Sequence, residues 1–285
     1  MEDNASPFML RRRLRTQLVA ARAERDLTQQ QVAEAMDWSM SKMNRIEKAK
    51  TGISTNDLRV LLPYYGIKDQ ERVKQLLALA RAAKQNPWWQ SYSDVASPEL
   101  LELMNYESAA SAISQFEPTF VPGILQTEEY ASAVLQVFND ERPGQRVERL
   151  VKLRTERRGL LSRENAPRFS FVLDESVIRR VAGSHAVMTQ QLQHLVNIGK
   201  LQKNITIQIV PFTAGLHRGM KGAFEIVQFE DTPDENVVFL EGSKDFINED
   251  IEEVQEYLEI FGHITDAALE PEESLKLLEA TANST

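Results

Sequence analysis

The four histidines are the first residues to test for chemistry, because histidine is the commonest general base and metal ligand. His185, His194, His217 and His263 are well separated, and none has the paired spacing of a zinc-binding motif. The chain has no cysteine, no glycine-rich phosphate loop and no nucleophile elbow. Carboxylates are abundant, but their number alone does not indicate a catalytic pair. We therefore expect no enzyme, no catalytic residues, no metal and no cofactor.

A different chemistry, attraction of phosphate, is indicated by the distribution of charge. The net charge of the chain is −9. Residues 1–92 nevertheless carry 16 Lys and Arg against 10 Asp and Glu, a charge of +6, which leaves −15 for the remainder. A basic domain attached to an acidic one is typical of a protein in which one part binds nucleic acid while the rest limits nonspecific binding.

The start of the chain and its apolar runs bear on location. Met1-Glu2-Asp3-Asn4 lacks the basic start and apolar stretch of a secretory signal, and no apolar run reaches the length of about 18 residues that spans a membrane. The absence of cysteine suits a reducing compartment. We expect a cytoplasmic protein with no membrane partner.

The elements that must position the basic residues are short helices. Thr28 and Gln31 have the spacing of a capping box, and Ser39 and Ser54 stand where N-caps are needed. Apolar residues recur at helical spacing between these signals. About five helices are predicted, over residues 10–25, 29–36, 40–48, 54–62 and 73–80.

The segment from Thr28-Gln29-Gln30-Gln31-Val32-Ala33 to Asn44-Arg45-Ile46-Glu47 resembles the phage-repressor-like (Xre-type) helix-turn-helix family, over about the first 66 residues. Glutamine opens the second helix, alanine stands where the two helices touch, and Ile-Glu ends the third. Asp37 departs from the family, which usually has glycine in a left-handed turn, but aspartate tolerates that conformation better than most residues. Glu47 is expected to pair with an arginine inside the domain.

The resemblance implies how the segment meets DNA. It places Gln29 at a phosphate and the start of the third helix in the major groove. The exposed candidates for base edges are then Ser39, Met40, Ser41, Lys42 and Arg45. Arg45 suits a bidentate contact with guanine, and Met40 suits a thymine methyl. Lys48, Lys50 and Thr51 suit backbone phosphates.

The remainder of the chain, after the helical pattern stops at Pro87, predicts an α+β domain with a small mixed sheet. Four short apolar runs are predicted as strands, over residues 169–173, 205–210, 224–229 and 237–240. Helices are predicted from Pro98, from Thr127 to Phe138, and over residues 145–161, 175–181, 187–201 and 249–268. Phe116–Gly123 is expected to be extended or a loop. The basic helix 145–161 is either a second nucleic-acid surface or, as we favour, a solvated face that pairs with acidic residues.

Nearly the whole chain also resembles actinobacterial regulators of the WhiJ-like type. The residues that carry this resemblance include Phe116-Glu117, Val121-Pro122-Gly123 with the eight residues after it, Gln191-Leu192, the segment 210–215 and Pro271-Glu272-Glu273-Ser274. The resemblance implies that the second domain senses a small ligand or a small cognate protein, and some members are described as antitoxin-like.

Two places suit a ligand in the second domain or at its start. Trp88 and Trp89 are either one wall of a ligand site or, as we favour, a packing anchor between domains. Phe212 and His217 lie in a glycine-containing segment between two predicted strands, which either lines a pocket or only connects the strands.

The sequence thus predicts a DNA-binding domain at 1–86 and an effector-binding and dimerisation domain at 87–285. We expect a homodimeric transcriptional regulator that binds operator DNA under the control of a ligand or partner protein. The alternative is an antitoxin-like protein-binding module whose DNA binding is autoregulatory.

Overall fold

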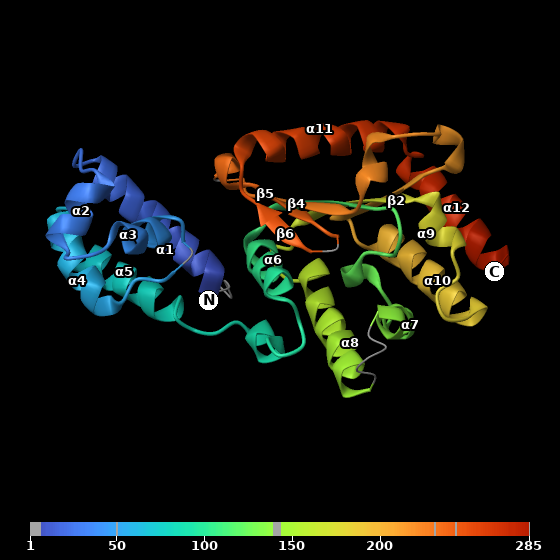
Figure 1. Ribbon diagram of the computed structural model, residues 1–285, viewed down its shortest axis with the longest axis horizontal. Helices are drawn as coiled ribbons and strands as arrows, with labels where there is room; N and C mark the ends of the chain where they lie inside the picture. Colours follow the sequence, from blue (N-terminus) through green and yellow to red (C-terminus); the bar gives the residue numbers. More distant parts are fainter. Residues whose placement is uncertain (1–6, 50, 139–143, 231, 243, 285) are drawn as a thin grey trace. The chain divides into compact units, whose positions relative to one another are not determined.

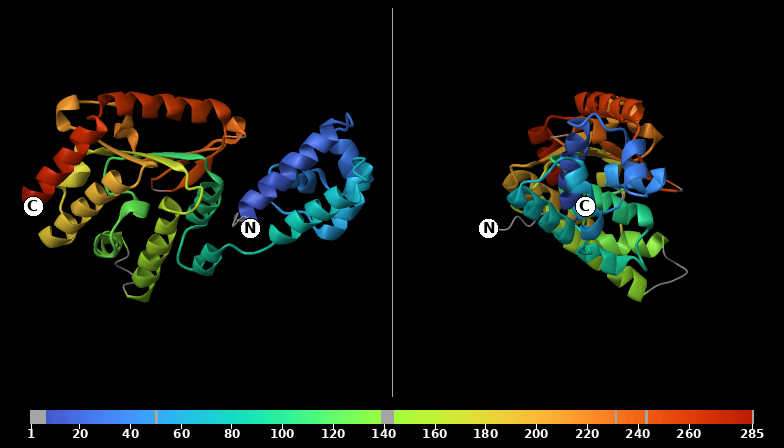
Figure 2. Two further views of the ribbon diagram at one scale, coloured as in Figure 1. Left: turned by 180° about the vertical axis from the view of Figure 1, so that it is seen from behind. Right: turned by 90° about the vertical axis from the view of Figure 1, so that its left-hand side faces the viewer.

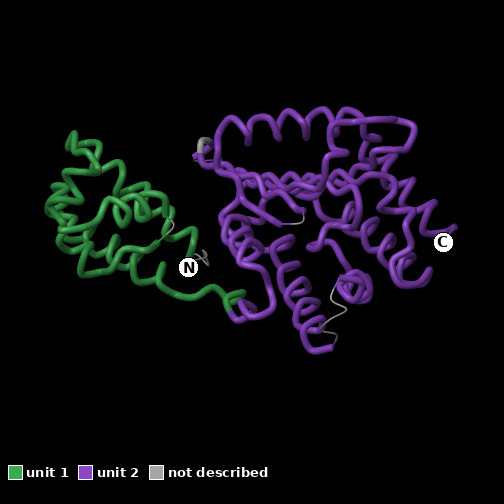
Figure 3. Tube along the Cα trace, viewed as in Figure 1, with its two compact units in different colours: residues 1–90 green, residues 91–285 purple. Residues whose placement is uncertain are grey.

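The computed structural model describes residues 7–49, 51–138, 144–230, 232–242 and 244–284. The chain divides into two compact units, Met1–Gln90 and Ser91–Thr285 (Figure 3). Among the described residues, no helix combines the length and the apolar character that crossing a bilayer requires.

The N-terminal unit is built from helices only, as predicted. Each helix contributes buried apolar side chains to one core, among them Leu14, Val32, Met43, Leu58 and Leu76. Capping by Thr28, Ser39 and Ser54 is confirmed, because each side chain accepts a hydrogen bond from a backbone N–H three residues later. The five helices are α1 (Pro7–Ala23), α2 (Gln29–Ala35), α3 (Met40–Glu47), α4 (Thr55–Tyr64) and α5 (Gln70–Ala82) (Figure 1).

The C-terminal unit is α+β with a mixed sheet, also as predicted. The sheet has six strands in the order β3-β2-β1-β4-β5-β6. The first three pair in parallel, and β4, β5 and β6 join antiparallel, starting from β1. The strands are β1 (Ala112–Glu117), β2 (Arg168–Asp174), β3 (Ile205–Val210), β4 (Phe224–Gln228), β5 (Val237–Leu240) and β6 (Phe246–Asn248).

Helices cover the two faces of this sheet, as the views of Figures 1 and 2 show. One face carries Phe116, Phe224 and Ile226, which pack with Ile260 and Ile264 of α11 into a buried apolar cluster. Most other helices lie on the opposite face, while α12 packs against α10 and the edge strand β3. The helices are α6 (Pro98–Ala109), α7 (Glu128–Phe138), α8 (Gln145–Arg157), α9 (Glu175–Arg179), α10 (His185–Leu201), α11 (Ile251–Ala267) and α12 (Pro271–Ser284).

Four elements differ from the sequence expectations. The central strand β1 was not predicted, because Ser114 and Gln115 interrupt its apolar pattern. It lies largely before Phe116–Gly123, the segment that was expected to be extended or a loop. The short strand β6 and the helix α12 were not predicted. The basic helix ends at Arg157, and a turn of 3-10 helix, Arg158–Leu161, completes the segment expected to be α-helical.

Candidate DNA-binding face and the C-terminal cavities

The turn between α2 and α3 has the backbone expected of a helix-turn-helix. Asp37 adopts φ of 54°, the left-handed conformation in which the sequence places aspartate instead of glycine. The backbone N–H of Trp38 then returns to the carbonyl of Ala33 at 2.8 Å, which closes the turn. Ser39 begins α3 at once, so the two helices are fixed by local interactions alone.

The carboxylate of Glu47 joins α3 to the two preceding helices. Arg22 of α1 donates from Nε and Nη2 to the two carboxylate oxygens, at 2.6 and 3.0 Å. Gln29 of α2 donates from Nε2 to Oε2 at 2.6 Å. Glu47 is 7% exposed, and the pairing with an arginine inside the domain that the sequence predicted is confirmed. This network holds α3 in one orientation against the domain.

Helix α3 therefore has an inner and an outer side. Met43, Ile46 and Glu47 are buried inside, as predicted for Met43 and Ile46. Met40 is 46% exposed, and Ser41, Arg45 and Lys48 are exposed as well. Within the described part of the chain, the Arg45 side chain makes no hydrogen bond or ion pair. The outer side therefore presents polar and basic groups that an external partner can contact.

Two of the other residues expected at DNA, Ser39 and Lys42, already have partners inside the domain. The Ser39 hydroxyl caps α3 by accepting from the backbone N–H of Lys42. The Lys42 ammonium donates to Asp57 Oδ2 at 3.1 Å and lies 4.3 Å from the centre of the Trp38 ring. Thr51 is exposed. Lys50 lies outside the described residues.

Each of the two places expected to bind a ligand has one exposed and one largely buried side chain. Phe212 is 59% exposed, whereas the His217 side chain is 7% exposed, 3.5 Å from Asp174 and edge-on to Phe116. Trp88 is 43% exposed and Trp89 is buried, and their rings meet edge to face at a centroid distance of 5.5 Å. None of the four lines either cavity described next.

The basic helix α8 turns its arginines inward. Arg157 donates from Nε to the buried Glu107 at 2.8 Å and from Nη2 to the other carboxylate oxygen. Burial alone would lower the pKa of Arg157, but Glu107 and Glu225 outweigh it and raise that pKa. Arg154 donates to Gln126, and Arg149 pairs with Asp94. Pairing with acidic residues is thus confirmed, while the solvated face is wrong for Arg157.

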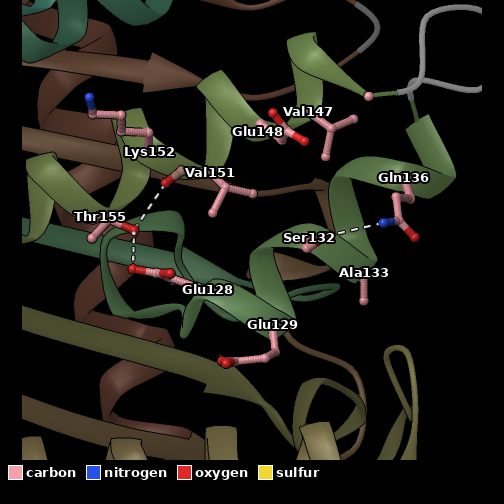
Figure 4. A pocket seen from close by; sticks show the side chains of 11 residues that line it. Glu128, Glu129, Ser132, Ala133, Gln136, Val147, Glu148, Val151, Lys152 and Thr155 are labelled. Carbon is pink, nitrogen blue, oxygen red and sulfur yellow. Dashed lines mark hydrogen bonds between the residues drawn. The ribbon is translucent and has the colours of Figure 1, made fainter.

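A groove of about 800 Å³ separates α7 and α8 at the surface (Figure 4). Glu128 at its edge accepts a hydrogen bond from Thr155 at 3.4 Å, and Glu129 and Glu148 are exposed. Because its acidic groups are exposed to solvent, the groove offers less to hold a specific ligand than a buried polar site would.

A second cavity, of about 600 Å³, lies over the middle of the sheet and is lined by carboxylates. Glu117 of β1 and Glu225 of β4 are 4% and 3% exposed, and Gln115 lies beside them. The sequence analysis missed these residues, because each is a single acidic residue in an apolar strand. Such a residue is normally interpreted as facing solvent. Among the described residues, no group of three or more histidines and carboxylates has a geometry that could hold a metal ion.

Comparison with known proteins identifies both halves of the chain. A family model described as a helix-turn-helix domain matches residues 13–76. A second model, described as a domain of unknown function (DUF5753), matches residues 100–280. No curated protein and no solved structure matches the chain. The first match contains α2, the turn and α3, and the second contains the sheet and the carboxylate-lined cavity.

Proposed function

Since the chain belongs to the DUF5753 family through residues 100–280 and carries a helix-turn-helix domain before them, we propose that it is a sequence-specific transcriptional regulator controlled through its C-terminal domain. In this proposal it is a cytoplasmic homodimer of the Xre type, related to the WhiJ-like actinobacterial regulators, and has no enzymatic activity.

The observation that carries the proposal is the outer side of α3. Its N-cap, its inner residues and the Glu47 network fix the helix against the domain, while Arg45 and Met40 point to solvent. A rigid helix with exposed basic and polar groups suits the major groove, where an arginine can read guanine O6 and N7. Ser41, Lys48 and Thr51 supply further contacts to bases and phosphates.

Two of the proposed contacts require a local exchange of partners. Lys42 must leave Asp57, and Gln29 must share its amide between Glu47 and a phosphate. The Lys42–Asp57 pair is about one third exposed on each side, so separating it costs little, at most about 1 kcal/mol. The Ser39 hydroxyl already caps α3, so its contact with DNA would use its remaining lone pair.

Dimerisation follows from the geometry of the target. One helix-turn-helix reads a half-site, and two-fold pairing reaches a second half-site about one helical turn of DNA away. The acidic C-terminal unit is the part that we propose to pair and to receive the signal.

Selection of bound duplexes from a random DNA pool, with the full chain, tests the proposal. The wild type should enrich one motif with two-fold symmetry. Arg45→Ala should weaken binding to the selected site by about 1–3 kcal/mol and relax the preference at one position in each half-site. Arg72→Ala is the matched control, because Arg72 is an exposed arginine of α5 outside the helix-turn-helix. If the wild type enriches no motif, the proposed function is wrong.

A further inference from the structure

The cavity over the middle of the sheet is enclosed by the C-terminal unit alone. Its floor is the face of β1 and β4 opposite α11, and its walls come from α6, α7 and α8. Its volume of about 600 Å³ falls within the usual range of ligand sites, about 300–1,000 Å³. The cavity is thus large enough for a small organic molecule.

Strand register brings three polar side chains together on the floor. Gln115 of β1 is the cross-strand partner of Glu225 of β4, and Glu117 follows two residues later on the same face. Gln115 donates from Nε2 to Glu117 Oε1 at 3.0 Å. Glu225 Oε2 lies 3.7 Å from Arg157 Nη2. Glu225 Oε1 is buried and has no hydrogen-bond partner among the described residues.

An acceptor left without a donor in a buried place destabilises the fold, and more so when the group is charged. Native proteins retain few such groups, and each calls for an explanation. Glu225 lines the cavity, so a ligand that enters the cavity lies beside this carboxyl group. A donor supplied by that ligand would satisfy it.

The charges around the cavity favour a cation as this donor. Arg157 already has a bidentate partner in Glu107, and Arg154 donates to Gln126. Five carboxylates surround the cavity or contact its arginines, against three guanidinium groups. The carboxylates are those of Glu107, Glu117, Glu225, Glu241 and Asp245, and the guanidinium groups are those of Arg146, Arg154 and Arg157.

The pKa values of the two buried carboxyl groups are shifted in the direction that neighbouring carboxylates cause. Burial raises the pKa of Glu117, and the neighbouring Glu241 and Glu225 raise it further. Burial also raises the pKa of Glu225, together with Glu107, against the opposing effect of Arg157. These carboxyl groups therefore tend to keep a proton where they are, and a cation beside them would favour their ionised forms.

Much of the remaining lining is apolar, beside the polar residues Ser97, Thr119 and Gln126. The apolar side chains offer no donor or acceptor to a ligand. They are Leu100, Leu103, Phe120, Val134, Leu150 and Phe239.

We propose that this cavity binds a small organic cation, with an ammonium or guanidinium group at Glu117 and Glu225 and an apolar body against the walls, and that this ligand is the signal of the regulator. The second half of the proposal rests on the proposed function, whereas the first stands on the cavity alone. A metal ion does not suit the site, because no three of the described carboxylates are arranged to share one.

Three probes with the same phenethyl body test the cation site in the full chain. Phenethylamine, phenethyl alcohol and 3-phenylpropanoate share an aromatic body and differ in charge, and calorimetry with two-dimensional NMR measures their binding. Phenethylamine should bind at least about tenfold more tightly than the other two, because a charge-assisted hydrogen bond is worth more than a neutral one. Benzylguanidine serves as the guanidinium probe. If neither cation binds, or if the alcohol or the carboxylate binds as tightly, the cation site is wrong.

Substitutions assign the binding to the floor of the cavity. Glu225→Gln should abolish the preference for phenethylamine over its alcohol, and without ligand it should keep or raise the melting temperature, because a neutral amide replaces a buried group that is costly to ionise. Glu107→Gln is the structural control and should lower the melting temperature, because it removes the bidentate partner of Arg157. If Glu225→Gln keeps the preference for the amine, the cation does not bind at this floor.

A final measurement separates the site from its role as a signal. The affinity of the full chain for its selected duplex is compared with and without saturating phenethylamine, in the wild type and in Glu225→Gln. A change in the wild type that is absent from the variant supports the signal role. An unchanged affinity, with the amine bound, overturns the signal role and leaves the cation site intact. A chain that selects no duplex overturns the proposed function, and the probe measurements still decide the site.

Discussion

Replacing Glu47 by alanine should loosen the DNA-binding domain more than any exposed substitution in it. Glu47 accepts two hydrogen bonds from Arg22 and one from Gln29, at 2.6 to 3.0 Å, and is buried. Removing one partner of a buried ion pair costs about 3–5 kcal/mol. The Arg22 side chain is 18% exposed, so water replaces part of what it loses, and we expect a cost near the lower end, about 3 kcal/mol.

Hydrogen exchange with mass spectrometry is the assay, because it locates the loss of stability without assuming that both units unfold together. In Glu47→Ala, amide protection should fall by about two orders of magnitude in α2 and α3, since about 1.4 kcal/mol corresponds to a factor of ten. Protection in the C-terminal sheet should not change. The control is Glu34→Ala, because Glu34 lies on the exposed side of α2 and accepts from Gln30. Protection in α3 that remains within threefold of the wild type would refute the view that this network holds the helix.

Three further outcomes follow from the same contacts. Gln29→Ala should weaken binding to all duplexes by a similar factor, because a phosphate contact carries no sequence information; a change confined to the selected site in a binding titration would contradict this. In sedimentation at micromolar concentration the full chain should be a dimer, whereas a fragment of residues 1–90 should be a monomer that binds the selected duplex more weakly; equal affinity would place dimerisation elsewhere. Because burial raises the pKa of Glu225, the folded unit keeps a proton that the unfolded chain releases, so this residue's contribution to stability should fall as the pH rises above about 4.3. In urea titrations from pH 4.5 to 8 the wild type should lose stability relative to Glu225→Gln as the pH rises, and a relative gain would contradict the direction of this pKa shift.

The N-terminal unit could be predicted closely because its signals are local. Thr28 with Gln31 and Ser39 with Lys42 are three residues apart, so the caps follow from spacing alone. The pairing of Glu47 with an arginine was predicted, but the choice of Arg22 was not, because the two residues are 25 positions apart and meet only through tertiary packing.

The C-terminal unit was predicted where strands are apolar throughout and missed where they are not. β2, β3, β4 and β5 were identified from their apolar and β-branched runs. β1 was not, because Ser114 and Gln115 break the pattern, although both are buried. A polar residue in a strand normally marks the solvent side. Here Gln115 lines a cavity, which single-sequence patterns cannot distinguish from solvent.

The position of that cavity follows from the topology of the sheet. The strands β2 and β3, which run parallel to β1, lie on one side of it. The antiparallel strands β4, β5 and β6 lie on the other side. The connection that leaves the end of β1 passes into α7 and α8 on the face opposite α11.

In open sheets with parallel strands, ligands bind beyond the carboxyl ends of the strands, where the strand order changes direction. Glu117 is the last residue of β1, at the point where this sheet changes direction. The register of β1 with β4 brings Gln115 beside Glu225, and Glu117 follows on the same face of β1, so all three line the cavity near this point. A carboxylate at this position costs stability when the cavity is empty. Its retention is therefore better explained by binding than by folding, since an apolar side chain on the same strand face would stabilise the sheet more.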